Sequence, residues 1–285
     1  MAIILGLGFT GERLARRLLL RGVPVSAPVR GIRRFPDLAL AGLQLSQLNL
    51  EHPETMLLPR NAVVAILIPP LPDPENAALR ETIRKIAPAR VVYVSSTGVY
   101  GDQIDIDEST PAVPSDDRGR LRLEEERWIA SGPWTSLILR SAAIYGPGRG
   151  IHVSIREGRL PRSAGSGIVS RIHVDDLAAI VEAGMFSDVQ GAWPVADDVP
   201  CSSEEIARWC RRLLQLEPAR GHEIPFGKRI PGRKVDGRKI REILKVDLLY
   251  PTWQAGIKAS LGQEMTKHLS KRLEMTQSLM KRKAR

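Results

Sequence analysis

The chain has 285 residues, of which 43% are hydrophobic and 26% are charged, and its formal net charge is +10. This length suits one large domain or one domain with a smaller lobe. Its apolar runs are shorter than the roughly 18 residues that a transmembrane helix needs, so we expect a soluble globular protein without a membrane partner. No basic leader precedes the first apolar run, which predicts a strand rather than a secretory signal and favours a cytoplasmic location.

The two cysteines, Cys201 and Cys210, fit a reducing compartment, and neither their spacing nor their neighbours predicts a metal site. Half of the net positive charge comes from residues 263–285, where seven Lys and Arg stand against two Glu. The other arginines are scattered without interleaved aromatic residues, so the pattern does not favour a nucleic-acid partner. Residues 263–285 are predicted to form a basic terminal helix, with a solvated or frayed extension as the alternative.

Short apolar runs alternate with segments of helical character along the first half of the chain. The runs cover residues 3–5, 23–29, 62–68, 91–94 and 136–139. Such strands, separated by amphipathic helices, are typical of a parallel sheet covered on both faces, so we predict a doubly wound α/β fold of the Rossmann type. In the first helix, Leu14 and Leu18 lie on one apolar stripe and Gly22 ends the helix.

The density of Gly and Pro and the later helices suggest how the chain is divided. Residues 1–195 are predicted to form the Rossmann domain, with a second clear helix at about 119–130 and a loop-rich insertion at about 146–172. Ser202, followed by glutamates, predicts a capped helix that runs to about residue 214. This helix would belong to a small substrate lobe at 196–262.

A glycine pattern follows the first strand and opens the first helix. Gly6, Gly8 and Gly11 stand at the spacing of a dinucleotide cradle, with Phe9 and Thr10 between the last two. The first glycine would make the tight turn, the second would let the backbone approach a diphosphate, and the third would let helix and strand pack closely. The alternative is a plain βα turn without a ligand.

The end of the second apolar run bears on the choice of coenzyme. It carries Arg30, and Arg33 follows shortly after. It lacks the acidic residue that would accept hydrogen bonds from both ribose hydroxyls of NAD. Guanidinium groups pair bidentately with a 2′-phosphate, so NADP is favoured and NAD is the alternative. A solvated basic turn would also explain these arginines. Asn49 could contact the adenine, or it could cap a turn at the surface.

Several ordered motifs together resemble a known family. They are GLGFTG from Gly6, VVYVSSTGVYG ending at Gly101, LRSAAIYGPGRG from Leu139, RIHVDDLA from Arg171 and YPTWQAGI from Tyr250. The chain resembles, over about residues 1–262, the extended short-chain dehydrogenase/reductases of the epimerase/dehydratase type, and especially their atypical branch. The resemblance implies an NAD(P)-dependent oxidoreductase or epimerase-like enzyme for a small carbonyl, hydroxyl or sugar-nucleotide substrate. It also allows a homodimer paired through helices.

By the same resemblance, Ser96 would hydrogen-bond the reacting carbonyl, with Ser95 beside the coenzyme and Thr97 beside the substrate. A serine that only caps a turn is the alternative. The family's catalytic Tyr-x-x-x-Lys pair is missing, because none of the four tyrosines is followed by lysine four residues later. Arg122 or Arg120 could hold the nicotinamide ribose in place of the lysine, and Asp117 or Asp116 could act as a general base if it is desolvated. An exposed helix cap is the alternative for either aspartate.

Four further side chains are predicted to line the substrate pocket: Arg140, Tyr145, Arg149 and His173. The arginines could bind an anionic substrate, and His173 could donate a proton near neutral pH. A structural, hydrogen-bonded histidine is the alternative. Because the catalytic pair is missing, a non-catalytic NADP-binding sensor or interaction module is the second hypothesis for the whole protein.

Overall fold

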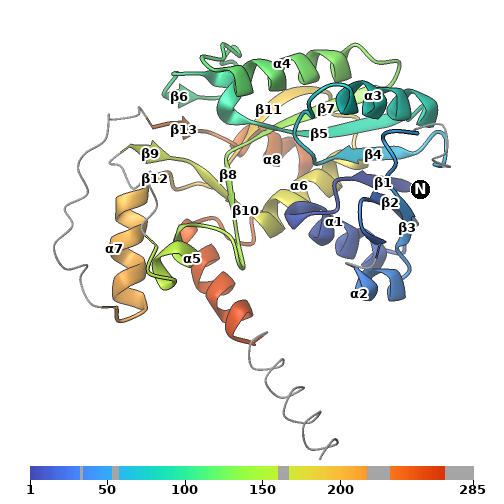
Figure 1. Cartoon of the computed structure of the whole chain (residues 1–285). Coiled ribbons are helices and arrows are strands. Elements are labelled where there is room, and N and C mark those ends of the chain that lie inside the picture. The colour runs from blue at the N-terminus through green and yellow to red at the C-terminus, as the bar shows by residue number, and fades with distance from the viewer. Residues whose placement is uncertain (33–34, 53–57, 160–166, 217–231, 267–285) are drawn as a thin grey trace, which may run out of the picture.

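Seven parallel strands form the central sheet of the protein (Figure 1). The computed structural model describes residues 1–32, 35–52, 58–159, 167–216 and 232–266. The strands are β1 (Ala2–Leu5), β2 (Val25–Val29), β3 (Gln44–Gln47), β4 (Val63–Ile66), β5 (Arg90–Ser96), β7 (Thr135–Ser141) and β11 (Gly191–Val195). Their spatial order is β11-β7-β5-β4-β1-β2-β3, which confirms the predicted doubly wound α/β fold.

Five of these strands correspond to the predicted apolar runs, whereas β3 and β11 were not predicted. Both lie at the edges of the sheet. The sequence of β3 is Gln-Leu-Ser-Gln, and no residue in it is fully buried. Strand β11 contains Pro194, which an edge strand tolerates. An edge strand needs fewer apolar residues than a central one, and this explains the missing signal.

Helices cover both faces of the sheet (Figure 1). On one face, α1 (Phe9–Leu20) packs beside α6 (Val174–Met185), and their buried side chains join those of β1 and β5. On the other face lie α3 (Glu75–Ile86) and α4 (Asp117–Ala130), which bury Ile83 and Ile129. Short elements complete this part: α2 (Pro36–Leu40), the 3-10 helix η3 (Thr97–Tyr100), β6 (Asp105–Ile106), β13 (Lys234–Val235) and α8 (Arg238–Leu244).

A smaller lobe stands beside the carboxyl edge of the sheet. It contains β8 (Ala143–Tyr145), α5 (Ile151–Arg156), β9 (Ile168–Val169), β10 (Arg171–His173), β12 (Cys201–Ser202), α7 (Ser203–Leu213) and a helix at 253–266. Its own hydrophobic cluster includes Tyr145, Ile206 and Trp253. Ser202 caps α7 by accepting a hydrogen bond from Glu205 N at 3.0 Å. These elements therefore share a hydrophobic cluster of their own, and the division of the chain at residue 196 stays a prediction.

Candidate functional site

The glycine cradle is built as the pattern predicts. Gly6 has a φ of +107°, a value that side chains rarely allow. A Cβ on Gly11 would lie 2.2 Å from Gly6 O, so only glycine lets α1 pack this closely on the turn. A Cβ on Gly8 would meet nothing within 4 Å, and no side chain caps the first turn of α1. Open space in front of uncapped N–H groups fits a diphosphate.

The residues predicted to hold the adenosine end of the coenzyme share one cavity of about 540 Å³. Arg30, Gln47, Asn49 and Glu75 are among its lining residues. Arg30 Nη2 lies 3.0 Å from Glu75 Oε2, and Asn49 Oδ1 accepts a hydrogen bond from His52 N at 3.0 Å. The Arg30 ion pair is exposed and therefore weak, so Arg30 can exchange Glu75 for a phosphate. Arg33 lies outside the described residues.

Ser96 ends β5 at the carboxyl edge of the sheet, two strands from β1. Its Oγ accepts a hydrogen bond from Gly98 N at 3.1 Å, so this serine does cap the turn into η3. Its hydroxyl proton is not used by that bond. Ser95 and Thr97 are both buried, and Ser95 Oγ has no hydrogen-bond partner among the described residues. Ser96 is the most accessible of these three hydroxyl side chains.

Helix α4 packs tightly on the turn that follows Ser96. A Cβ on Gly119 would lie 2.8 Å from Gly98 O, which is closer than real Cβ contacts. Asp117 is 91% exposed and lies 2.6 Å from Arg120, so it is not the desolvated base that the sequence hypothesis required. Arg122 is partly buried on the same helix. Its charge opposes the rise in the pKa of Tyr93 that burial causes.

Arg140 has a structural partner. Its guanidinium makes an ion pair with Glu126, with Nη2 and Oε2 2.8 Å apart, and Glu126 is buried. The same guanidinium carbon lies 5.0 Å from the centre of the Tyr100 ring. Hydrogen bonds to Glu126 raise the pKa of Arg140 even though burial opposes the charge. These contacts occupy the guanidinium of Arg140, which was predicted from the sequence to bind an anionic substrate.

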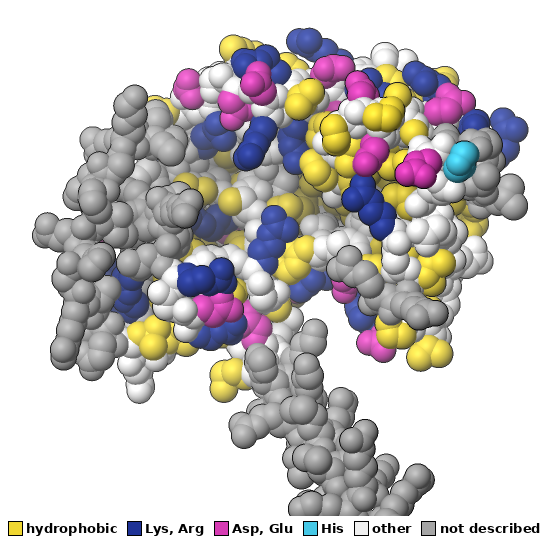
Figure 2. Space-filling view, viewed as in Figure 1, with side chains coloured by type: hydrophobic (Ala, Val, Ile, Leu, Met, Phe, Trp, Pro, Cys, Tyr) yellow, Lys and Arg dark blue, Asp and Glu magenta, His cyan; other side chains and the backbone are white. Residues whose placement is uncertain are grey.

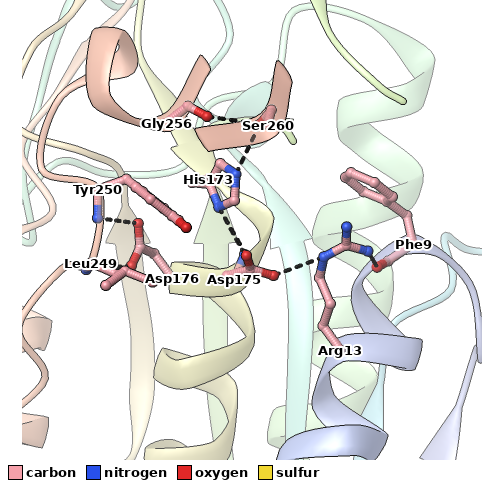
Figure 3. Close-up of polar contacts among 9 residues, drawn as sticks. All are labelled: Phe9, Arg13, His173, Asp175, Asp176, Leu249, Tyr250, Gly256 and Ser260. Atoms are coloured by element: carbon pink, nitrogen blue, oxygen red, sulfur yellow. Dashed lines mark hydrogen bonds and ion pairs between the residues drawn. The ribbon is translucent and has the colours of Figure 1, made fainter. Parts of the chain in front are cut away.

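His173 is the N-cap of α6 and is fully buried (Figure 3). Asp175 N donates to its Nδ1 at 3.2 Å, so Nε2 carries the proton and donates to Ser260 Oγ at 3.1 Å. Ser260 in turn donates to Gly256 O at 2.7 Å. Burial lowers the pKa of His173 to about 4, so the ring is neutral at pH 7. This arrangement matches the structural alternative for His173.

Asp175 also connects this histidine to the glycine cradle (Figure 3). Its Oδ1 lies 2.8 Å from Arg13 Nε, and Arg13 Nη1 donates to Phe9 O at 2.9 Å. The neighbouring Asp176 accepts from the backbone N–H groups of residues 249 and 250, at 2.7 and 3.1 Å. Helix α6 thus links the start of α1 to the segment before the last described helix. The role of Arg13 was not predicted from the sequence, because the spacing of a single helix gives no sign of a partner so far along the chain.

Tyr145 is buried, and its hydroxyl has no hydrogen-bond partner among the described residues. Its ring packs edge-to-face against His173, with centres 5.2 Å apart. Arg149, in contrast, is exposed and lies beside Phe9, with 5.3 Å between its guanidinium carbon and the ring centre. Figure 2 shows Lys and Arg side chains around a hollow between the α3 and α4 layer and the smaller lobe. Of the four predicted substrate-pocket residues, only Arg149 is exposed.

No group of three or more His, Cys, Asp or Glu in the described ranges is placed to hold a metal ion. Within the same ranges, none of the helices has the length and apolar character needed to cross a bilayer. Both cysteines are free and buried, and burial raises the pKa of each thiol to about 12.

Two curated proteins resemble the chain over most of its length. Protein YeeZ of Escherichia coli strain K12 is 27% identical in an alignment that covers 87% of this chain and 95% of YeeZ. A 3-diazoavenalumate denitrifying reductase of a Streptomyces species is 27% identical in an alignment that covers 88% of this chain and 96% of the reductase. No family model matches the chain.

Solved structures share the fold. A conserved protein of unknown function from Silicibacter pomeroyi has a TM-score of 0.78 at 28% identity, covering 92% of this chain and 98% of that one. A proposed NAD-dependent epimerase/dehydratase from Methylobacillus flagellatus has a TM-score of 0.72 at 27% identity, covering 92% and 97%. WbmG of Bordetella bronchiseptica, solved with NAD and UDP, has a TM-score of 0.74 at 15% identity, covering 92% and 93%. These similarities confirm the family resemblance and the fold.

Proposed function

We propose that the chain, which resembles the extended short-chain dehydrogenase/reductases, binds NAD(P)H and catalyses an oxidoreductase or epimerase/dehydratase-like reaction. The substrate would be a small carbonyl or hydroxyl compound or a sugar nucleotide. One observation carries this proposal: the glycine cradle after β1 and Ser96 at the end of β5 lie at the same edge of the sheet. Ligands of open α/β sheets bind at this edge.

A bound pyridine nucleotide would supply the chemistry of hydride transfer. Gly8 and the uncapped N–H groups of α1 would bind the diphosphate, and the cavity beside Arg30 and Asn49 would hold the adenosine. The hydroxyl of Ser96 would donate a hydrogen bond to the reacting oxygen. Its proton is available for this, because the hydrogen bond from Gly98 N uses only a lone pair of the same hydroxyl. Arg122 would steady the nicotinamide ribose from α4.

We infer that NADP is preferred, because Arg30 can pair with a 2′-phosphate when it leaves Glu75. NAD is the alternative, since the Glu75 carboxylate lines the same cavity and could accept from ribose hydroxyls. A cytoplasmic location and a homodimer stay predictions from the sequence. Light scattering on the purified protein would test the homodimer.

A direct test combines binding with turnover. Titration with NADPH and NADH should show binding of at least one coenzyme, and a panel of carbonyl compounds and sugar nucleotides should show its oxidation or reduction. Ser96→Ala should lower kcat and leave coenzyme affinity unchanged, since Ser96 acts on the substrate. Well-folded protein that binds neither coenzyme would contradict the proposal.

A second candidate function is a non-catalytic sensor of NADP. It is favoured by the missing Tyr-x-x-x-Lys pair and by the exposure of Asp117, which is therefore not a desolvated base. General acid–base catalysis usually contributes about 10² to 10⁴-fold, so an enzyme without it would be slow. Coenzyme binding without turnover on any tested substrate would support the sensor. A specific product would exclude it.

A further inference from the structure

Arg149 is an exposed cation held beside the first turn of α1. Its guanidinium carbon lies 5.3 Å from the centre of the Phe9 ring, and Phe9 is the first residue of that helix. Arg149 ends a turn that begins at Gly146. Gly146 also lies close to Phe9, because a Cβ on Gly146 would be 3.1 Å from Phe9 Cζ. The turn that follows β8 therefore brings a positive charge to the helix end that faces the proposed diphosphate.

The charge of Arg149 is not neutralised within the described chain. Two guanidinium groups flank Phe9, and Arg13 is the nearer at 4.5 Å from the ring centre. Arg13 pairs with Asp175 at 2.8 Å, whereas no carboxylate of the described residues lies within ion-pair distance of Arg149. An unpaired cation beside the positive end of a helix is unfavourable by itself. An anion between the two would be stabilised by both.

The smaller lobe fixes the backbone that carries Arg149. Gly146 and Arg149 exchange two backbone hydrogen bonds, at 2.9 and 3.0 Å. Between them, Gly148 N donates to Glu264 Oε1 at 2.5 Å, and Glu264 also makes an ion pair with Arg156. Glu264 belongs to the helix at 253–266. Little conformational entropy would be lost when the turn binds a ligand, because its backbone is already held.

We propose that Arg149 binds the diphosphate of the pyridine nucleotide, and so is a coenzyme residue rather than a substrate residue. This inference rests on the proposed function. The cradle around Gly8 supplies backbone N–H donors only, and Arg149 adds a side chain whose planar fork pairs with two phosphate oxygens. Because Arg149 comes from the smaller lobe, the coenzyme would connect the two parts of the protein.

The test compares two ligands that each carry one of the coenzyme's two phosphate groupings. ADP-ribose contains the diphosphate without a 2′-phosphate, and 2′-AMP contains a 2′-phosphate without the diphosphate. Both are titrated by calorimetry into wild type, Arg149→Ala, Arg149→Lys and the control Arg159→Ala. Arg159 is a suitable control because it is an exposed arginine of the same lobe that pairs with Glu157.

Arg149→Ala should weaken ADP-ribose binding by roughly tenfold or more, as expected for a lost charge-assisted hydrogen bond. Arg149→Lys should recover part of the affinity, since it restores the charge but not the fork. Binding of 2′-AMP should stay within about twofold of wild type in every variant, and Arg159→Ala should leave both ligands unchanged.

Equal ADP-ribose affinity in wild type and Arg149→Ala would overturn the inference, and so would equal losses for ADP-ribose and 2′-AMP. Either result leaves the proposed function intact, because wild type still binds the nucleotide. Failure of wild type to bind ADP-ribose, NADPH and NADH would overturn both the inference and the proposed function. The Tm of each variant confirms that the exposed side chain was removed without unfolding the protein.

Discussion

Substitution of Gly11 by alanine should destabilise the fold, whereas the same substitution at Gly8 should not. A Cβ at residue 11 would lie 2.2 Å from Gly6 O and 3.1 Å from Gly6 C, and both atoms belong to the backbone. Relief of this overlap needs a shift of about 1 Å between α1 and the turn. Overpacking of this kind costs about 1–3 kcal/mol. For a chain of this size the cost corresponds to a decrease in Tm of roughly 2–5 °C.

A Cβ at residue 8 would meet nothing within 4 Å, and the φ of Gly8 is −107°, outside the positive range that favours glycine. Its methyl group would instead occupy the space assigned to the diphosphate. Gly8→Ala should therefore keep the wild-type Tm and weaken NADPH binding by about tenfold or more. Scanning calorimetry of the ligand-free proteins and titration calorimetry with NADPH separate the two effects. A wild-type Tm for Gly11→Ala would refute the packing argument, and wild-type affinity for Gly8→Ala would refute the placement of the diphosphate.

Arg140→Ala should lower the free energy of unfolding by about 3–5 kcal/mol, because it leaves the buried Glu126 carboxylate unpaired; urea unfolding that shows no loss would restore Arg140 as a candidate for substrate binding. Burial lowers the pKa values of His152 and His173 to about 4, below the ordinary value of 6.5. Both should bind protons on unfolding, so each histidine should add up to about 3 kcal/mol of stability as the pH rises from 4 to 6.5. Burial raises the pKa of Asp176 to about 6 and that of Asp197 to about 8, and these two carboxyls act in the opposite direction over the same range. Urea unfolding of wild type and His173→Gln at several pH values isolates the contribution of one histidine, and a difference between the two proteins that does not change with pH would contradict it. Glu75→Gln should free Arg30 and raise the preference for NADPH over NADH by up to about fivefold, since an exposed ion pair contributes at most about 1 kcal/mol; an unchanged ratio of the two dissociation constants would argue against a 2′-phosphate at Arg30.

The parts of the fold that were predicted are those with strong local signals. The strand before Gly6, the stripe of α1 and the capped helix from Ser203 each follow from periodicity or from turn chemistry within about a dozen residues. Strands β3 and β11 lack such a signal, because an edge strand contacts the sheet on one side and tolerates polar residues or proline.

The candidate site also contains a residue whose position was predicted and residues whose roles were not. Ser96 was predicted at the end of a strand, and the structure places it there with one lone pair already bonded. The roles of Arg140, His173 and Asp117 could not be decided from the sequence, since each depends on a partner or on an exposure that one helix or strand does not reveal. The pairing of Arg140 with Glu126 used the charge that had been assigned to a substrate.

The order of residues along the chain was enough to determine an α/β sheet with a dinucleotide cradle, because glycine spacing and apolar periodicity are local properties of a strand, a turn and a helix. Only the tertiary structure decided which charges are neutralised. His173 meets Ser260 across 87 residues of sequence, and Gly148 meets Glu264 across 116. Contacts at such separations arise when the two parts of the protein pack together, and that packing places Arg149 beside the start of α1 with no carboxylate partner among the residues that the structure describes.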